Sequence, residues 1–125
     1  MGRNTRIAVW VISVLLAGLY LSGGIPKMAG AENTVKGFHE WGFSDGFRIF
    51  IGCAETAGGI GLLLPPLATW AALGLSIIMV GAAYTHFVHP PAFFALIPIL
   101  CFFLLLFIAR ARRGQAVLLA KPETA

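Results

Sequence analysis

The chain has 125 residues, of which 58% are hydrophobic and only 11% are charged. An ordinary soluble domain has about 25% charged residues, and a domain this small leaves a large share of its surface in contact with solvent. The composition therefore excludes a typical water-soluble protein and predicts that a lipid bilayer solvates most of the chain. The net charge of +4 does not indicate a nucleic-acid partner, because the basic residues stand at the ends of apolar segments and form no stripe with interleaved aromatic residues.

The first apolar segment, residues 7–25, contains no charged residue. Its length is close to the ~20 residues that a helix needs to cross the hydrocarbon layer, so we predict a membrane span. A cleaved signal peptide is the alternative, since Arg3 and Arg6 would form its basic start and residues 29–31 have the small-x-small form of a cleavage site. The apolar run exceeds the ~7 to 15 residues of a signal-peptide core, which favours the span.

Further apolar segments follow, and each is long enough for a helix that crosses the membrane. They are residues 47–64, 67–86 and 92–109. Pro65-Pro66 and Pro90-Pro91 separate them, because proline ends a helix and favours a turn. The stretch between the first two spans, residues 26–46, is polar but contains aromatic residues, which predicts a loop against the membrane surface.

The predicted fold follows from the absence of water in the bilayer core. Backbone N–H and C=O groups find no partner in lipid, so the spans must be helical. Short connections between them predict an all-α, integral membrane antiparallel four-helix bundle in residues 1–113. Residues 114–125 are predicted to form a polar cytoplasmic tail.

Lysine and arginine are distributed unevenly between the two ends of this bundle. Four spans place both termini at the same end, which has six such residues: Arg3, Arg6, Arg110, Arg112, Arg113 and Lys121. The other end has three: Lys27, Lys36 and Arg48. By the positive-inside rule, both termini are predicted to lie in the cytoplasm and residues 26–46 outside a cell (inner) membrane.

Small residues predict how the helices pack, because lipid-embedded helices associate through close backbone contact. The second span has such a face, made of Gly52, Glu55, Gly58, Gly59 and Leu62. The third has Gly74, Ile78, Gly81 and Thr85 at helical spacing. We expect these faces to form the helix contacts, and we expect the phenylalanine-rich fourth span to be the most exposed to lipid.

Glu55 lies inside a predicted span, about 12 Å below the outer end of its helix. An ionised side chain at this depth costs at least ~2.5 to 3.5 kcal/mol, so it should face the bundle interior and be paired, solvated or protonated. We predict a cavity open to the outside, with Glu55 at its floor and Lys27, Arg48 and His86 around its mouth. The alternative is a structural role, in which Glu55 hydrogen-bonds a neighbouring group and fixes the helix register.

Metal and thiol chemistry find little support in the sequence. His86 and His89 have the spacing to ligate a metal together with His39 or Glu40, but histidines before Pro90-Pro91 are more simply explained as marking a helix end. Cys53 lies about 200° around the helix from Glu55 and so faces away from the cavity. We therefore predict no metal ligands and no catalytic residues, and no cofactor is evident.

Three sequence elements occur in order along the chain: residues 22–27 (SGGIPK), residues 52–55 (GCAE) followed by residues 58–63 (GGIGLL), and residues 79–82 (MVGA) with His86. With these elements the chain resembles the DoxX-like family over nearly its whole length. The resemblance implies a short four-helix membrane protein, most often bacterial.

The resemblance also implies functional expectations. The family's lysine, second-helix glutamate and third-helix histidine match Lys27, Glu55 and His86. Some relatives are linked to thiosulfate:quinone oxidation or thiol stress complexes, and distant animal relatives are similar to receptor-assembly chaperones. Longer DoxX proteins have a glycine-rich stretch and an acidic end where this chain has arginine residues, which favours the short DoxX-like branch.

We expect a non-catalytic bundle that binds a lipid, a quinone-like molecule or a partner transmembrane helix in the outward-facing cavity over Glu55. The alternative is a membrane subunit of a thiol/sulfur:quinone oxidoreductase complex, with quinone as its cofactor. A proton or ion path is a third hypothesis. The expected partners are the lipid bilayer and either other membrane proteins or further copies of this chain.

Overall fold

The computed structural model describes residues 1–119, which are helical and contain no strand. The elements in chain order are α1 (Arg3–Ala29), α2 (Glu32–Glu40), α3 (Asp45–Leu62), α4 (Pro65–Val88), the 3-10 helix η1 (Ala92–Ala95), α5 (Leu96–Ala111) and the 3-10 helix η2 (Arg113–Gln115). The predicted all-α class is therefore confirmed.

Three helical segments are long and apolar enough to cross a membrane. They are Arg3–Ala29, Pro65–Val88 and Ala92–Ala111. Helix α3 has 18 residues and contains Asp45, Arg48 and Glu55, so its length and composition do not identify it as a span in the same way. Three of the four predicted spans thus correspond to helices that are apolar throughout most of their length.

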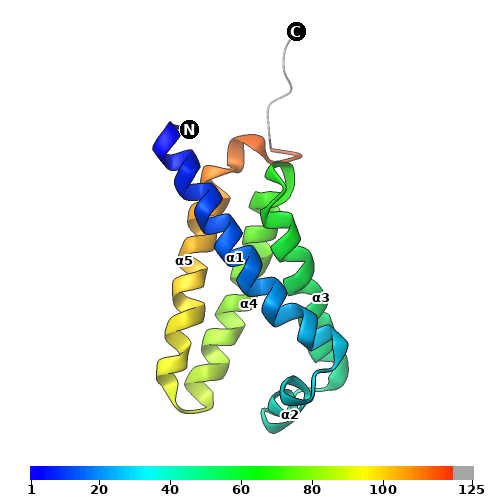
Figure 1. Ribbon diagram of the computed structural model, residues 1–125. Helices are drawn as coiled ribbons and strands as arrows, with labels where there is room; N and C mark the ends of the chain where they lie inside the picture. The colour runs from blue at the N-terminus through cyan, green and yellow to red at the C-terminus, as the bar shows by residue number, and fades with distance from the viewer. Residues whose placement is uncertain (120–125) are drawn as a thin grey trace.

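The long helices run back and forth along the molecule, and α1 crosses the others obliquely (Figure 1). Helix α1 packs mainly on α3, α3 also contacts α4, and α4 packs along α5. The beginning of α1 and the end of α5 lie at one end of the molecule, and α2 lies at the opposite end (Figure 1). The buried core between them includes Leu16, Tyr20, Leu62, Leu75 and Leu105.

The polar stretch after the first span is more helical than the sequence predicted. Helix α1 continues through Pro26 and ends at Ala29, where Gly30 adopts a left-handed conformation with φ of 75°. Lys27, Met28 and Ala29 favour helix, and a left-handed glycine is a common helix terminator. A second left-handed glycine, Gly42 with φ of 83°, follows α2. The predicted loop is therefore a short helix with a left-handed glycine near each end.

Helices α1 and α3 cross with their backbones in direct contact. A Cβ atom added to Gly24 would lie 2.9 Å from the Gly52 carbonyl oxygen, and one added to Gly52 would lie 2.7 Å from the Met28 amide nitrogen. Gly58 faces the other way, toward Leu75 of α4 at 2.7 Å. The small residues of α3 therefore allow close contact with two neighbouring helices, α1 and α4.

The predicted packing face of the third span was wrong at its two glycines, whereas Ile78 of that face packs against the core. Gly74 and Gly81 face open space, with nothing within 4 Å of an added Cβ atom. The buried side of α4 instead includes Ala68, Ala72 and Leu75. The reason is that the glycines in contact belong to α3: Gly58 lies against Leu75 of α4, and Gly61 lies against Ala71.

Large apolar side chains cover the outer surface of the molecule, as expected for a protein solvated by lipid. Leu15 is 68% exposed on α1, and Phe103 is 61% exposed on α5. The phenylalanines of α5 are largely on this surface, although Phe102 is half-buried. The prediction that this span is the most exposed to lipid is not supported, because the three apolar spans are buried to the same extent.

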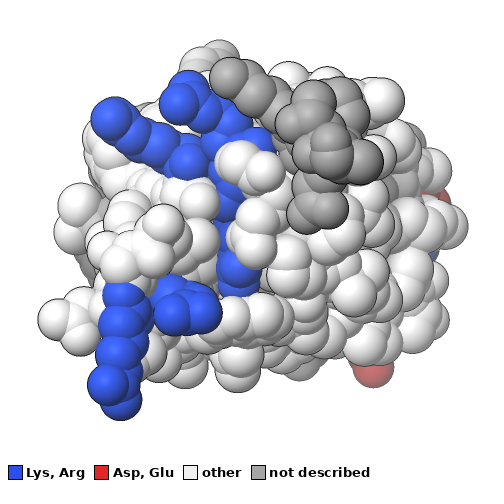
Figure 2. All heavy atoms as spheres, turned by 90° about the horizontal axis from the view of Figure 1, so that it is seen from above, with Lys and Arg blue, Asp and Glu red and all other residues white. Residues whose placement is uncertain are grey.

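The end of the molecule that holds the N-terminus is rich in arginine. Figure 2 shows Lys and Arg side chains gathered across this face, with acidic residues at the margin of the view. The arginines that belong to this end are Arg3, Arg6, Arg110, Arg112 and Arg113. Arg112 lies 4.6 Å above the ring of Trp10 and so connects the end of α5 to α1.

The beginning of the predicted polar tail packs against α4. The Val117 amide donates to the Pro66 carbonyl oxygen at 2.9 Å, and the Trp70 indole donates to the Val117 carbonyl oxygen at 2.8 Å. Residues 120–125 of the predicted tail, including Lys121, lie outside the described residues.

Candidate functional site

An ion pair between α1 and α3 is the central feature of the candidate site. The Lys27 ammonium donates a hydrogen bond to Oε1 of Glu55. Glu55 is only 5% exposed, and Lys27 is half-buried. The sequence reasoning placed Lys27 near Glu55 without requiring contact, whereas the structure joins them directly. Pairing offsets much of the cost of enclosing either charge.

The local sequence explains why the two charged groups can meet. Because Gly24 and Gly52 lack side chains, α1 and α3 approach closely enough for the last turn of α1 to lie beside Glu55. Gly23 completes the arrangement, since a Cβ atom there would lie 3.6 Å from Oε2 of Glu55 and 3.8 Å from the Lys27 ammonium. A side chain at this position would therefore lie against the ion pair, and glycine avoids that contact.

Arg48 lies behind the ion pair. Its guanidinium donates to the Lys27 carbonyl oxygen, and it is 6% exposed. A second guanidinium nitrogen lies 3.6 Å from Asp45. The last carbonyl groups of a helix lack partners within that helix, so Arg48 satisfies one of those of α1. The structure thus places Arg48 where it holds the backbone of Lys27.

A cleft of about 860 Å³, here called the Glu55 cleft, opens between α2, α3 and α4. Its lining includes Lys27, Glu55 and His86 but not Arg48. Among the lining residues of α3, Glu55 lies farthest along the helix from Asp45. The structure therefore brings three of the four predicted site residues to one cleft, with Glu55 deep within it.

Most of the remaining lining is apolar. The aromatic residues are Phe38, Trp41, Phe43, Phe47, Phe50 and Tyr84, and the larger aliphatic residues are Ile51, Ile77, Ile78, Met79 and Val88. A concave site with a mainly apolar lining and a few polar groups is typical of a small-molecule binding site.

Trp41 connects α2 to the end of α4. Its ring meets His86 edge-on with centroids 5.3 Å apart and stacks on His89 at 5.7 Å. Sequence reasoning did not select Trp41 as a site residue, although its place in an aromatic-rich polar stretch was a usable signal. His86 therefore contacts the aromatic wall of the cleft, whereas Lys27 and Glu55 pair with each other.

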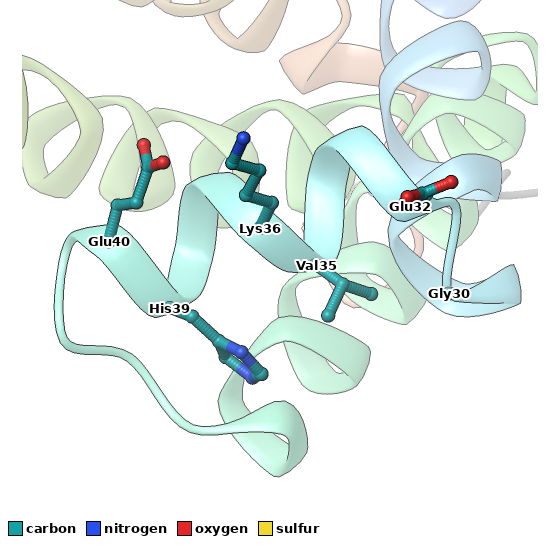
Figure 3. A pocket seen from close by; sticks show the side chains of 6 residues that line it. All are labelled: Gly30, Glu32, Val35, Lys36, His39 and Glu40. Carbon is teal, nitrogen blue, oxygen red and sulfur yellow. The ribbon is translucent and has the colours of Figure 1, made fainter.

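A second, shallow hollow lies on the side of α2 away from this cleft, between Gly30 and Glu40. Figure 3 shows Lys36 and Glu40 pointing to one side of α2, and Val35 and His39 to the other. His39 Nε2 lies 2.8 Å from Asp45 Oδ1. The candidate metal ligands of the sequence are not gathered, and residues 1–119 contain no cluster of three potential ligands.

The cysteines do not lie at this site. Cys53 is exposed on the surface, Cys101 is buried, and both are free thiols. Neither lines the Glu55 cleft. A molecule bound in the Glu55 cleft would therefore contact the ion pair and the aromatic side chains of the lining, and it would contact no thiol.

In a comparison with protein families, the model described as the DoxX-like family matches residues 11–109. The matched range includes Lys27, Glu55 and His86, and it contains every residue that lines the Glu55 cleft. Neither the curated proteins nor the solved structures give a match to this chain.

Proposed function

Because this chain belongs to the DoxX-like family, we propose that its α3 crosses the membrane beside the three apolar helices, as the fourth span of an antiparallel bundle. The charges of α3 are compatible with this arrangement. Asp45 stands at the first residue of the helix, Arg48 is enclosed against the end of α1, and Glu55 is paired with Lys27. Charged residues within membrane spans are tolerated when they face the protein interior and are paired.

We propose that both termini lie in the cytoplasm and that the Glu55 cleft opens toward the outside. The support is the distribution of charge along the molecule. The arginine-rich face in Figure 2 belongs to the end that holds the N-terminus, and cytoplasmic ends of membrane proteins have an excess of lysine and arginine. The cleft is lined by α2 and by the end of α4, at the opposite end of the molecule.

The function that we propose is non-catalytic binding of an amphiphilic molecule in the Glu55 cleft. The observation that carries the proposal is the combination of a large apolar cleft with a part-buried ion pair in its lining. The apolar walls suit a hydrocarbon chain or ring system, and the ion pair suits a polar end. Neither a thiol nor a metal-ligand cluster accompanies these groups within residues 1–119.

Such a molecule can enter from the bilayer rather than from water. Three residues that line the cleft are also strongly exposed on the outer surface: Phe50 is 66%, Ile77 is 74% and Tyr84 is 69% exposed. In a membrane these side chains contact lipid, so an amphiphile in the bilayer meets an apolar path into the cleft.

Two glycines of α4 provide a matched test. Gly81 lines the cleft and Gly74 does not, yet both have open space around them. We expect Gly81→Phe to fill the cleft and to reduce the fraction of protein that retains an amphiphile by about tenfold, whereas Gly74→Phe retains it. Native mass spectrometry of protein purified in mild detergent measures the retained mass.

The wild-type protein should carry one additional mass in the range of a lipid or a similar amphiphile. Equal retention by the two glycine variants, or no retained molecule in the wild type, would contradict the proposal. A retained quinone whose reduction responds to added thiols or sulfur compounds would instead support the oxidoreductase alternative.

A further inference from the structure

The geometry points to an uncharged, hydroxyl-bearing polar end on the amphiphile that the Glu55 cleft binds, rather than a carboxylate, a phosphate or an amine. This inference rests on the proposed binding function and specifies the class of its ligand. It follows from the unused hydrogen-bonding capacity of the Lys27–Glu55 pair and from the balance of its charges.

The ion pair leaves donors and an acceptor unused side by side. A lysine ammonium has three N–H donors, and the hydrogen bond of Lys27 to Glu55 Oε1 uses one of them. Within residues 1–119, no hydrogen bond reaches the second carboxylate oxygen, Oε2. Both groups line the Glu55 cleft, and Gly23 places no side chain against them. A hydroxyl group is both a donor and an acceptor, so it can accept from Lys27 while it donates to Glu55.

The charges of the pair disfavour ionic polar ends. Lys27 and Glu55 together are neutral, and both line the cleft. A carboxylate or phosphate beside Lys27 would also lie beside the Glu55 carboxylate, and an amine beside Glu55 would lie beside the Lys27 ammonium. Like charges this close in a largely enclosed site strongly disfavour the ionised form of either. Arg48 contacts the Lys27 backbone from outside the lining of the cleft, and apart from this pair the lining formed by residues 1–119 contains no lysine, arginine, aspartate or glutamate.

The test compares amphiphiles with the same saturated chain and different polar ends: a primary alcohol, a methyl ester, a carboxylate and an amine. Each is added at equal concentration to delipidated wild-type protein, and native mass spectrometry measures the occupied fraction. We expect the alcohol to bind about tenfold more tightly than the carboxylate and the amine. The ester accepts but does not donate a hydrogen bond, so it should bind more weakly than the alcohol.

Two substitutions should then change which polar end binds most tightly. Glu55→Gln leaves Lys27 unpaired and should raise binding of the carboxylate, whereas Lys27→Gln leaves Glu55 unpaired and should raise binding of the amine. Glu32→Gln and Lys36→Gln change the same charges on α2, outside the lining of the Glu55 cleft, and should change neither preference.

The outcomes separate this inference from the function on which it rests. Equal binding of all four amphiphiles by the wild type would overturn the inference and leave the proposed binding function intact. Absence of binding by any of them, together with no retained molecule from the source membrane, would overturn both. The wild-type series decides the matter even if a charge variant does not fold.

Discussion

At the scale of single residues, the molecule buries charged side chains whose burial would cost free energy if they had no partner. Glu55 and Arg48 are both largely buried, yet each has a partner from α1: the side chain of Lys27 for one and its backbone carbonyl for the other. Hydrogen bonds therefore hold both the ammonium and the backbone carbonyl of Lys27, and its ammonium lines the Glu55 cleft. This double attachment explains how a flexible lysine can present donors at a defined place.

Asp45 gives a prediction about pH. Its hydrogen bond with His39 and the attraction of the neighbouring His39 and Arg48 charges hold its pKa below the ordinary value of 3.8. A lowered pKa in the folded state stabilises the fold above the unfolded pKa, and this stabilisation is lost as the pH falls through the folded pKa. We expect the unfolding temperature of the wild type to decrease as the pH is lowered below 3.8. In Asp45→Asn this decrease should be smaller.

The measurement is a melting curve in detergent across roughly pH 2 to 6, the range in which a carboxylate titrates. Glu32→Gln serves as the control, because it removes an acidic side chain of α2, at the same end of the molecule as Asp45. Identical pH profiles for Asp45→Asn and the wild type would show that the contact with His39 does not stabilise the fold.

At the scale of elements, the crossing of α1 and α3 positions the site. We predict that Gly24→Ala destabilises the protein by about 1 to 3 kcal/mol, because the new methyl group would overlap backbone atoms that cannot move aside. The added Cβ atom would lie 2.9 Å from both the Gly52 carbonyl oxygen and the Thr56 amide nitrogen. The same substitution should weaken binding in the cleft, since it separates Lys27 from Glu55.

Gly18 provides the matched control on α1, because nothing lies within 4 Å of an added Cβ atom there. Gly18→Ala should raise stability by about 0.5 to 1 kcal/mol, since alanine favours the helix interior. Thermal unfolding in detergent measures both variants. A Gly24→Ala protein as stable as Gly18→Ala would contradict the close crossing of these helices.

Helix α2 has a different relation to the rest of the molecule. None of its residues is buried, and the left-handed glycines Gly30 and Gly42 stand near its two ends. Phe38 packs near Phe43 and Phe47, and Trp41 meets the histidines at the end of α4. Aromatic contacts rather than a buried helix face therefore hold α2 as one wall of the Glu55 cleft.

At the scale of the whole molecule, the uneven distribution of charge predicts the orientation in the membrane. Glu32→Cys on α2 and Gln115→Cys on η2 leave every lysine and arginine in place, and both positions are exposed. In a background with Cys53 and Cys101 replaced by alanine, a membrane-impermeant maleimide should label Glu32→Cys in intact cells. It should label Gln115→Cys only after permeabilisation. The reverse pattern would place the cleft on the cytoplasmic side.

The helical class and the three apolar helices are properties that the sequence alone determined. Composition requires a lipid environment, and backbone groups in lipid require helices, so neither conclusion depends on which side chains meet. The selection of Lys27, Glu55 and His86 also needed only the chain, because charged residues near apolar spans and an ordered set of motifs are visible along it.

The pairing within that set was decided by the tertiary structure. The oblique crossing at Gly24 and Gly52 brings Lys27 onto Glu55, turns Arg48 toward the end of α1, and leaves His86 to the aromatic wall. Gly58 faces Leu75 of α4, whereas Gly74 and Gly81 lie outside the helix contacts. Helical periodicity gives the face on which a residue lies, but the partner of that face depends on how two surfaces fit together.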